Sequence, residues 1–114
     1  MDINFISRIE NAIWFRSKFQ KVLVNGKKTG TLRLGRRIPR FETLPVILTE
    51  TKMCIGQARI VVLAWLRFAE IINYPVILQR EYPHEYNQIW IEMKKVYPDM
   101  TEKSWVTFYG FNME

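Results

Sequence analysis

Cysteine and histidine are scarce in this chain of 114 residues, which has one of each, Cys54 and His84. A single cysteine excludes an intramolecular disulfide and a cysteine-rich zinc cluster. One histidine adds too few ligands for a conventional structural zinc site, so we expect no metal and no cofactor. Cys54 and His84 could still form a nucleophile–base pair, although a buried structural cysteine and a surface histidine are the simpler interpretation.

Long apolar runs are also missing. The longest apolar stretch without charge covers residues 60–66, far short of a membrane span. The first ten residues, MDINFISRIE, lack the basic and apolar regions of a signal peptide. We therefore expect a cytoplasmic protein without a membrane partner. The length and the 48% hydrophobic residues suit one domain, 1–114, with a single core that needs no stabilising disulfide bond or metal ion.

Carboxylates are absent between Glu10 and Glu42. Residues 1–41 hold ten basic and two acidic side chains (+8), whereas residues 42–114 hold seven basic and nine acidic ones (−2). The basic side chains of the first segment have no local acidic partners, so we expect them to form one positive surface. Such a surface favours a polyanionic partner, most often nucleic acid.

The hydrophobic pattern mixes helical and extended periods. It predicts helices at 2–10 (capped by Asp2), 16–24 and 83–96, and strands at 12–15, 31–34, 46–50, 57–68, 76–78 and 105–111. Residues 44–72 could also be one long helix, but the β-branched run at 60–62 favours two strands. In the last helix, Ile89, Met93 and Val96 are expected to face the core, and Pro83 suits its first position. This order predicts an α+β fold with a small, curled, mostly antiparallel sheet.

The segment Gly26-Lys27-Lys28-Thr29-Gly30-Thr31-Leu32-Arg33 runs from a helix end through a turn into a strand. Period-two alternation places Thr29, Thr31 and Arg33 on one face, close to a lysine of the turn. Such a group could supply a general base, a hydroxyl nucleophile and an anion clamp. The same pattern also occurs in an ordinary basic turn followed by strand threonines.

The order of these pieces resembles the ASCH domain, a PUA-like family of small β-barrels associated with RNA. The resemblance covers residues 12–111, leaving 1–11 as an N-terminal extension. It rests on the helix before Gly26, the Thr31-Leu32-Arg33 strand, the strand at 57–68, and a helix that ends at Tyr97-Pro98 before the aromatic strand at 105–111. It implies a barrel of about five to six mostly antiparallel strands with two to three helices.

Within that family the chain is most similar to small bacterial N4-acetylcytidine amidohydrolases. The similarity implies that Lys28 is the general base and Thr31 the nucleophile, while Arg33 orients the substrate or stabilises the oxyanion. It also implies a glutamate acid, for which Glu81 is the nearest candidate and Glu85 the second. Further substrate-binding candidates are Thr29, Arg36, Arg37 and Arg40.

Two other functions remain open. The first is a non-catalytic module that binds RNA or a nucleotide through the same cleft and the patch formed by Arg36, Arg37 and Arg40. The second is a protein-interaction factor, for example one encoded by a mobile element, whose basic surface contacts an acidic partner.

Overall fold

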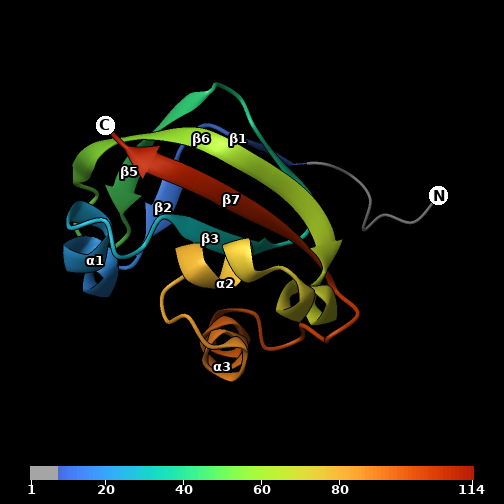
Figure 1. Cartoon of the computed structure of the whole chain (residues 1–114). Coiled ribbons are helices and arrows are strands. Elements are labelled where there is room, and N and C mark those ends of the chain that lie inside the picture. Colours follow the sequence, from blue (N-terminus) through green and yellow to red (C-terminus); the bar gives the residue numbers. More distant parts are fainter. Residues whose placement is uncertain (1–7) are drawn as a thin grey trace.

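The structure is a computed structural model that describes residues 8–114 (Figure 1). Its strands are β1 (Arg8–Glu10), β2 (Ile13–Phe15), β3 (Gly30–Leu34), β4 (Arg37–Pro39), β5 (Thr43–Leu48), β6 (Cys54–Arg67) and β7 (Trp105–Met113). Its α-helices are α1 (Gln20–Val24), α2 (Pro75–Arg80) and α3 (Tyr86–Val96), and its 3₁₀ helices are η2 (Ser17–Phe19) and η3 (Phe68–Asn73). Among the described residues, no helix has the length and apolar content needed to span a bilayer.

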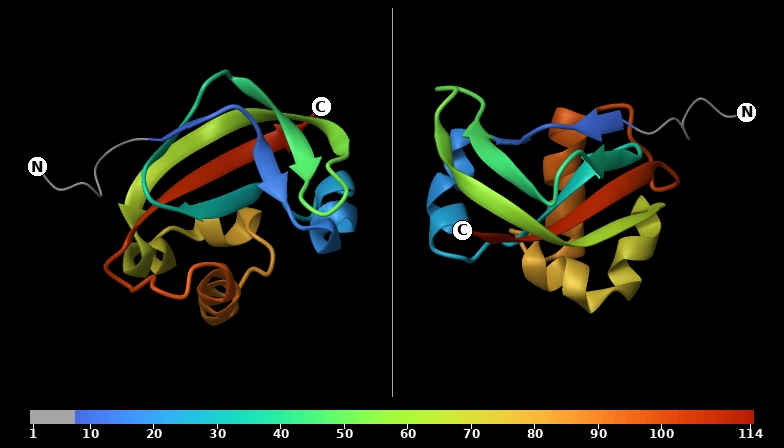
Figure 2. Two further views of the ribbon diagram at one scale, coloured as in Figure 1. Left: turned by 180° about the vertical axis from the view of Figure 1, so that it is seen from behind. Right: turned by 90° about the horizontal axis from the view of Figure 1, so that it is seen from above.

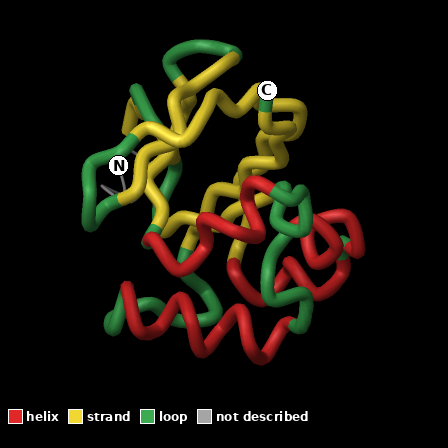
Figure 3. Tube along the Cα trace, turned by 90° about the vertical axis from the view of Figure 1, so that its left-hand side faces the viewer, coloured by secondary structure: helices red, strands yellow, loops and turns green. Residues whose placement is uncertain are grey.

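Five strands form one curled sheet in the order β2-β5-β6-β7-β3, and β1 pairs with β4 in a small second sheet. The pairs β5–β6, β6–β7 and β3–β7 are antiparallel, whereas β2–β5 and β1–β4 are parallel. The long strands β6 and β7 run side by side through the middle of the sheet (Figure 2). Seen from the side, the strands curl around one centre and the helices gather beneath them (Figure 3).

The sheet separates two apolar clusters. One lies between the sheet and the helices and includes Leu32, Phe108, Ile89 and Met93. The other fills the curl of the sheet and includes Phe15, Leu23, Tyr109 and Phe111. Alternation along β3 and β7 explains the division, because neighbouring residues of a strand point to opposite faces. The α+β fold with a small, mostly antiparallel barrel-like sheet is therefore confirmed.

Several predicted elements agree with the structure in position and type. The strands at 12–15, 31–34 and 105–111 correspond to β2, β3 and β7, and the helix at 16–24 corresponds to η2 and α1. The choice of two strands within 44–72 was right, although β5 and β6 each begin three residues earlier than predicted.

Other predictions were wrong. Arg8–Glu10 is strand β1, because it pairs with β4, a strand that the pattern did not predict. The remainder of the helix predicted at 2–10, with its cap Asp2, lies outside the described residues. The segment predicted as a strand at 76–78 belongs to helix α2, which Pro75 begins and whose Ile77 is buried.

The last helix begins later than predicted, and one of its three expected core residues is exposed. Pro83 follows a cis peptide bond after Tyr82, and α3 begins only at Tyr86. Ile89 and Met93 face the core as expected, but Val96 is 54% exposed. Val96 is the last residue of the helix, and it is absent from the buried cluster between the sheet and the helices to which Ile89 and Met93 belong.

Candidate active site

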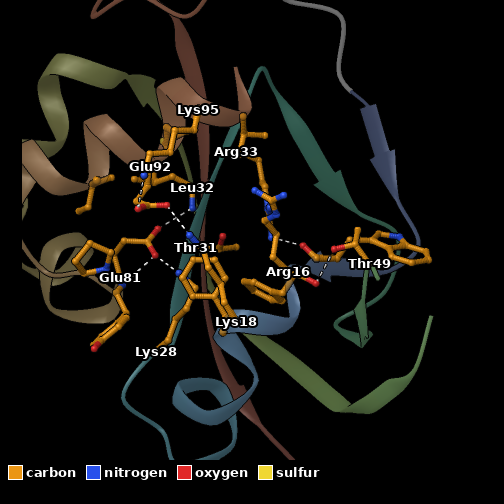
Figure 4. A pocket seen from close by; sticks show the side chains of 18 of the residues that line it. Arg16, Lys18, Lys28, Thr31, Leu32, Arg33, Thr49, Glu81, Glu92 and Lys95 are labelled. Carbon is orange, nitrogen blue, oxygen red and sulfur yellow. Dashed lines mark hydrogen bonds and ion pairs between the residues drawn. The ribbon is translucent and has the colours of Figure 1, made fainter. Parts of the chain in front are cut away.

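A cavity of about 560 Å³ opens between the curled sheet and α3. It receives side chains from β2, η2, β3, the segment after α2, and α3 (Figure 4). Lys28, Thr31, Arg33 and Glu81 all line it. Four of the residues proposed for chemistry from the sequence therefore share one space, although they come from positions up to 53 residues apart.

The centre of the cavity wall is a buried ion pair between Lys28 and Glu81. Lys28 is 2% exposed and Glu81 is 6% exposed. The Glu81 Oε1 atom accepts a hydrogen bond from Lys28 Nζ and another from the Tyr82 backbone N–H at 3.0 Å. Its Oε2 atom accepts the Leu32 backbone N–H at 3.1 Å. The carboxylate is thus fixed by three donors, and one of them belongs to strand β3.

Two glycines explain how Glu81 reaches β3. Gly30 and Gly110 are paired in register on β3 and β7. A Cβ on Gly30 would lie 2.8 Å from the Arg80 Cβ and 2.7 Å from an atom of the Phe108 ring. The Thr29 backbone N–H donates to the Arg80 carbonyl at 2.8 Å. Because there is no side chain at Gly30, the end of α2 lies directly on the sheet. Glu81 is the next residue after α2, so its side chain is close enough to contact β3.

Thr31 is 4% exposed and is paired in register with Tyr109. Since Tyr109 belongs to the cluster inside the curl, the side chain of Thr31 points to the same side, away from the helix-facing Leu32. Figure 4 shows Thr31 between the Glu81 carboxylate and Arg33.

Arg33 spans the cavity from β3. Its Nη2 atom donates to the Trp14 carbonyl of β2 at 2.6 Å, and its guanidinium lies 4.9 Å from the centre of the Phe15 ring. The Phe19 ring lies 5.1 Å from Lys28 Nζ. Both cations therefore rest against aromatic faces, which favours a positive charge there.

Burial has the largest effect on the pKa values of Lys28 and Arg33. It lowers the pKa of Lys28 below its ordinary value, against the opposing effect of the Glu81 carboxylate. Burial also lowers the pKa of Arg33, and the nearby Arg37 acts in the same direction. The neutral, basic form of Lys28 is consequently more accessible than that of a lysine in water.

The other predicted residues lie elsewhere. Thr29 does not line the cavity. Arg36 and Arg37 line a second hollow, whereas Arg40 lines neither and lies 5.6 Å from the Phe41 ring. Glu85 is exposed at the start of α3 and does not line the cavity either, which leaves Glu81 as the carboxylate beside Lys28.

Cys54 is exposed at the start of β6, where its Sγ contacts the Gly56 carbonyl. His84 contacts the Leu78 carbonyl through Nδ1. Neither residue lines the cavity. Cys54 is therefore not the buried cysteine that the sequence suggested.

An ion pair that crosses the cavity could not be predicted from the sequence pattern. Lys18 of η2 and Glu92 of α3, which both line it, form an ion pair of 2.8 Å. Tyr97, at the end of α3, lines the cavity as well, and its hydroxyl accepts from Arg37 Nη2 at 3.4 Å. Their separation along the chain left no local signal for these contacts.

Comparison with known proteins supports the fold. No family model and no curated protein matches the sequence. The structure resembles a mutant form of the ASCH protein of Zymomonas mobilis with a TM-score of 0.63 and 18% identity, covering 93% of this chain and 68% of that one. It resembles the ASCH domain from Lactobacillus crispatus with a TM-score of 0.65 and 11% identity, covering 94% and 79%. A protein from Enterococcus faecalis of the family model DUF984 aligns at a TM-score of 0.62 and 11% identity, covering 90% and 78%. The chain therefore has the fold of ASCH domains.

Proposed function

We propose that the protein is an amidohydrolase that removes an acyl group from a modified nucleoside such as N4-acetylcytidine. The observation that carries the proposal is the buried Lys28–Glu81 pair, which shares one cavity with Thr31. The volume of about 560 Å³ falls within the range typical of small-molecule sites. Aromatic rings of Phe15, Phe19 and Tyr82 line it and suit a planar base.

The first half of the reaction is acyl transfer to Thr31. The Thr31 hydroxyl oxygen attacks the acyl carbonyl carbon while neutral Lys28 takes the hydroxyl proton. The carbonyl oxygen becomes an oxyanion, which the Arg33 guanidinium stabilises from across the cavity. The C–N bond then breaks, and the leaving amine takes a proton delivered by the Lys28–Glu81 pair through Glu81.

The second half releases the acid. Water attacks the Thr31 ester and loses a proton to the same basic pair, after which the ester C–O bond breaks and Thr31 recovers its hydroxyl proton. Acetate and cytidine are the products when the substrate is N4-acetylcytidine. No oxidant, reductant or further co-reactant is required.

The test is incubation of the purified chain with N4-acetylcytidine, followed by chromatography of released cytidine. We expect release by the unaltered chain and a loss of at least about 100-fold in kcat with Thr31→Val, which keeps the β-branched shape but removes the nucleophile. Thr43→Val is the matched control, because Thr43 is also a strand threonine but lies outside the cavity. Equal release by the Thr31 variant and the unaltered chain would rule out Thr31 as the nucleophile.

The alternative is a module that binds a nucleoside or nucleotide in this cavity without catalysis. The same experiment separates the two functions when it is combined with calorimetric titration. Binding of N4-acetylcytidine without release of cytidine would support the alternative and exclude the amidohydrolase.

A further inference from the structure

A small cavity of about 50 Å³ lies beside the apolar cluster inside the curl of the sheet. Its lining includes residues of β1, β2, β3, β4 and β7, and its polar side chains are Glu10, Arg33, Arg37 and Tyr109. Arg33 and Trp14 line both this space and the candidate active site. We call this space the inner cavity. It contacts the arginine that the proposed reaction uses, but no step of that reaction uses the cavity itself.

The hydroxyl of Tyr109 is buried and makes no hydrogen bond to any residue within 8–114. Tyr109 as a whole is 1% exposed. Burial raises the pKa of this hydroxyl above its ordinary value, and the Glu10 carboxylate acts in the same direction, so the group keeps its proton. A hydroxyl that loses its bonds to water on folding and gains none in return is costly. Buried hydroxyls are therefore usually bonded to the protein or to ordered water.

The charged side chains around the inner cavity have partners but also spare hydrogen-bonding capacity. Arg37 donates from Nη1 to Glu10 Oε1 at 2.7 Å and from Nε to the Leu34 carbonyl at 3.0 Å. Arg33 donates from Nη2 to the Trp14 carbonyl at 2.6 Å. A guanidinium has five N–H donors and a carboxylate has about four lone-pair sites, so these contacts do not use all of them. A molecule in the cavity can bond to several of these groups at once.

The register of the sheet places Tyr109 beside Arg33. Thr31 pairs with Tyr109, and Arg33 pairs with Thr107, on β3 and β7. Tyr109 and Arg33 are therefore diagonal neighbours, and alternation points both side chains to the same face. Such neighbours lie roughly 7–8 Å apart, within reach of aromatic and long side chains. One small molecule is enough to bridge the polar ends of two side chains placed in this way.

Water is the ligand that fits the inner cavity. The volume of about 50 Å³ exceeds the share of one molecule in liquid water, about 30 Å³. A buried water molecule needs roughly two to four polar partners, and the lining offers guanidinium donors, carboxylate acceptors and a hydroxyl that does both. The two arginines disfavour a metal cation, and Glu10 disfavours an anion, because like charges repel. A neutral molecule that both donates and accepts meets neither penalty.

We propose that the inner cavity binds ordered water that joins the Tyr109 hydroxyl to Arg33 and Glu10, and that Tyr109 is thereby a positioning residue for Arg33. The arginine is held from two sides, by the Trp14 carbonyl and by the water, so its guanidinium keeps one orientation toward the candidate active site. The effect on catalysis rests on the function proposed above. The water and the attachment of Arg33 can be measured without it.

The first test measures stability. Tyr109→Phe keeps the ring in the core and removes only the hydroxyl, so the variant should fold. If water joins the hydroxyl to charged groups, the variant should unfold at a lower urea concentration than the unaltered chain. Tyr86→Phe is the matched control, because Tyr86 packs on the Phe68 ring and lines neither cavity, and it should shift the midpoint less. An unchanged or higher midpoint for Tyr109→Phe would overturn the proposal, since the hydroxyl would then have no partner to lose.

The second test locates the water and follows Arg33. A high-resolution crystal structure should show ordered water within roughly 3.2 Å of the Tyr109 hydroxyl oxygen, and a dry cavity would overturn the proposal. In NMR spectra, hydrogen exchange at Arg33 Nε should be at least roughly threefold faster in Tyr109→Phe. Arg33→Lys assigns that signal, and Arg59, in an exposed ion pair, is the internal reference. Equal exchange in both chains would show that Tyr109 does not hold Arg33.

The third test asks whether Tyr109 acts through Arg33 in catalysis. With N4-acetylcytidine, Tyr109→Phe should lower kcat roughly fivefold or more and leave KM nearly unchanged, because the oxyanion that Arg33 stabilises forms only during the reaction. In an Arg33→Lys background the same change should have little further effect. Losses that multiply in the double variant would show that Tyr109 acts independently of Arg33, and would overturn its role as a positioning residue.

These measurements separate the inner cavity from the enzymatic proposal. If the unaltered chain releases no cytidine, the proposed function fails, whereas the urea midpoint, the ordered water and the Arg33 exchange still decide the role of Tyr109. If cytidine is released but Tyr109→Phe changes neither the midpoint nor the exchange, the activity stands and the water-mediated attachment is overturned.

Discussion

At the scale of single residues, the Lys28–Glu81 pair is the buried ion pair at the centre of the candidate site. Both side chains are buried, and the carboxylate has donors on both of its oxygens. A buried pair of this kind is costly to desolvate, and its partners must compensate one another. The pair therefore bears on the stability of the fold and on the activity that we propose.

The first prediction concerns pH. The pKa of Lys28 is lowered mainly by burial, so the side chain loses its proton below the pH at which an ordinary lysine does. Hydrolysis of N4-acetylcytidine should rise with pH as Lys28 becomes neutral and level off before the ordinary lysine pKa is reached. The profile of kcat/KM against pH measures this. Lys28→Arg, whose guanidinium keeps its proton, should remove the rise. An inflection at the ordinary lysine value would contradict the prediction.

The same shift affects stability in a definite direction. Between the lowered pKa of folded Lys28 and the ordinary value, the unfolded chain binds more protons than the folded one. The contribution of Lys28 to the free energy of unfolding therefore rises with pH across that window.

The second prediction concerns the loss of one partner. Lys28→Met leaves the Glu81 charge buried without its cation and should lower the free energy of unfolding by about 3–5 kcal/mol. The double variant K28M/E81Q should be more stable than K28M, because the charge is gone while an amide oxygen can still accept a backbone N–H.

Urea denaturation measures both variants of the pair. The exposed pair Lys18–Glu92 provides the control, and Lys18→Met should cost at most about 1 kcal/mol. If Lys28→Met and Lys18→Met lowered the free energy of unfolding equally, burial of the Lys28–Glu81 pair would not make the loss of its lysine more costly.

At the scale of elements, the approach of α2 to β3 decides which glutamate enters the site. The contact needs a glycine at position 30, since a Cβ there would meet both the Phe108 ring and Arg80. Arg80 also donates from Nη1 to the Phe111 carbonyl of β7 at 3.2 Å. The helix end is therefore attached to both strands that it covers.

The third prediction follows from this close approach. Gly30→Ala should lower the free energy of unfolding by about 1–3 kcal/mol and reduce hydrolysis, because α2 and Glu81 must move away from Lys28. Gly26→Ala is the control. Its backbone has a φ of +79° but open space around the new Cβ, so it should cost about 1–2 kcal/mol of stability without moving Glu81. Thermal unfolding and kcat, measured for both variants, test the difference. A Gly30→Ala variant with full activity would show that α2 does not need this contact.

Elements with a strong local pattern could be predicted from the sequence, whereas elements that depend on partners could not. β3 and β7 show alternation or a run of aromatic residues, and both were found. β1 and β4 are three residues each and exist because they pair with one another, which no local pattern records. The segment 76–78 is apolar and short, so its pattern does not distinguish a strand from the buried turn of a helix.

At the scale of the whole molecule, Arg33 connects the two edges of the curled sheet. β2 and β3 are the terminal strands in the order β2-β5-β6-β7-β3. The hydrogen bond from Arg33 Nη2 to the Trp14 carbonyl joins them at 2.6 Å. The closure of the sheet and the positive charge of the site therefore depend on the same side chain.

The fourth prediction concerns this closure. Arg33→Lys keeps a positive charge but loses the planar group that reaches β2, so the contact should weaken by about 1–3 kcal/mol. We expect faster amide hydrogen exchange in β2 and β3, with little change in β6 and β7. Arg59→Lys, at an exposed ion pair on β6, is the matched control. Unchanged exchange in β2 would show that other contacts close the sheet.

The sequence by itself determined the α+β class, the segregation of charge, and the turn-to-strand segment that carries Lys28, Thr31 and Arg33. These features depend on composition, periodicity and short spacings, which are properties of neighbouring residues. Only the tertiary structure placed Glu81 against Lys28, because that contact requires α2 to lie on a glycine pair contributed by two different strands. The tertiary structure also gathered Arg8, Arg67 and Lys103 beside Arg36 and Arg37. Residues far apart in the chain meet through strand pairing, and no local pattern specifies which of them will be neighbours.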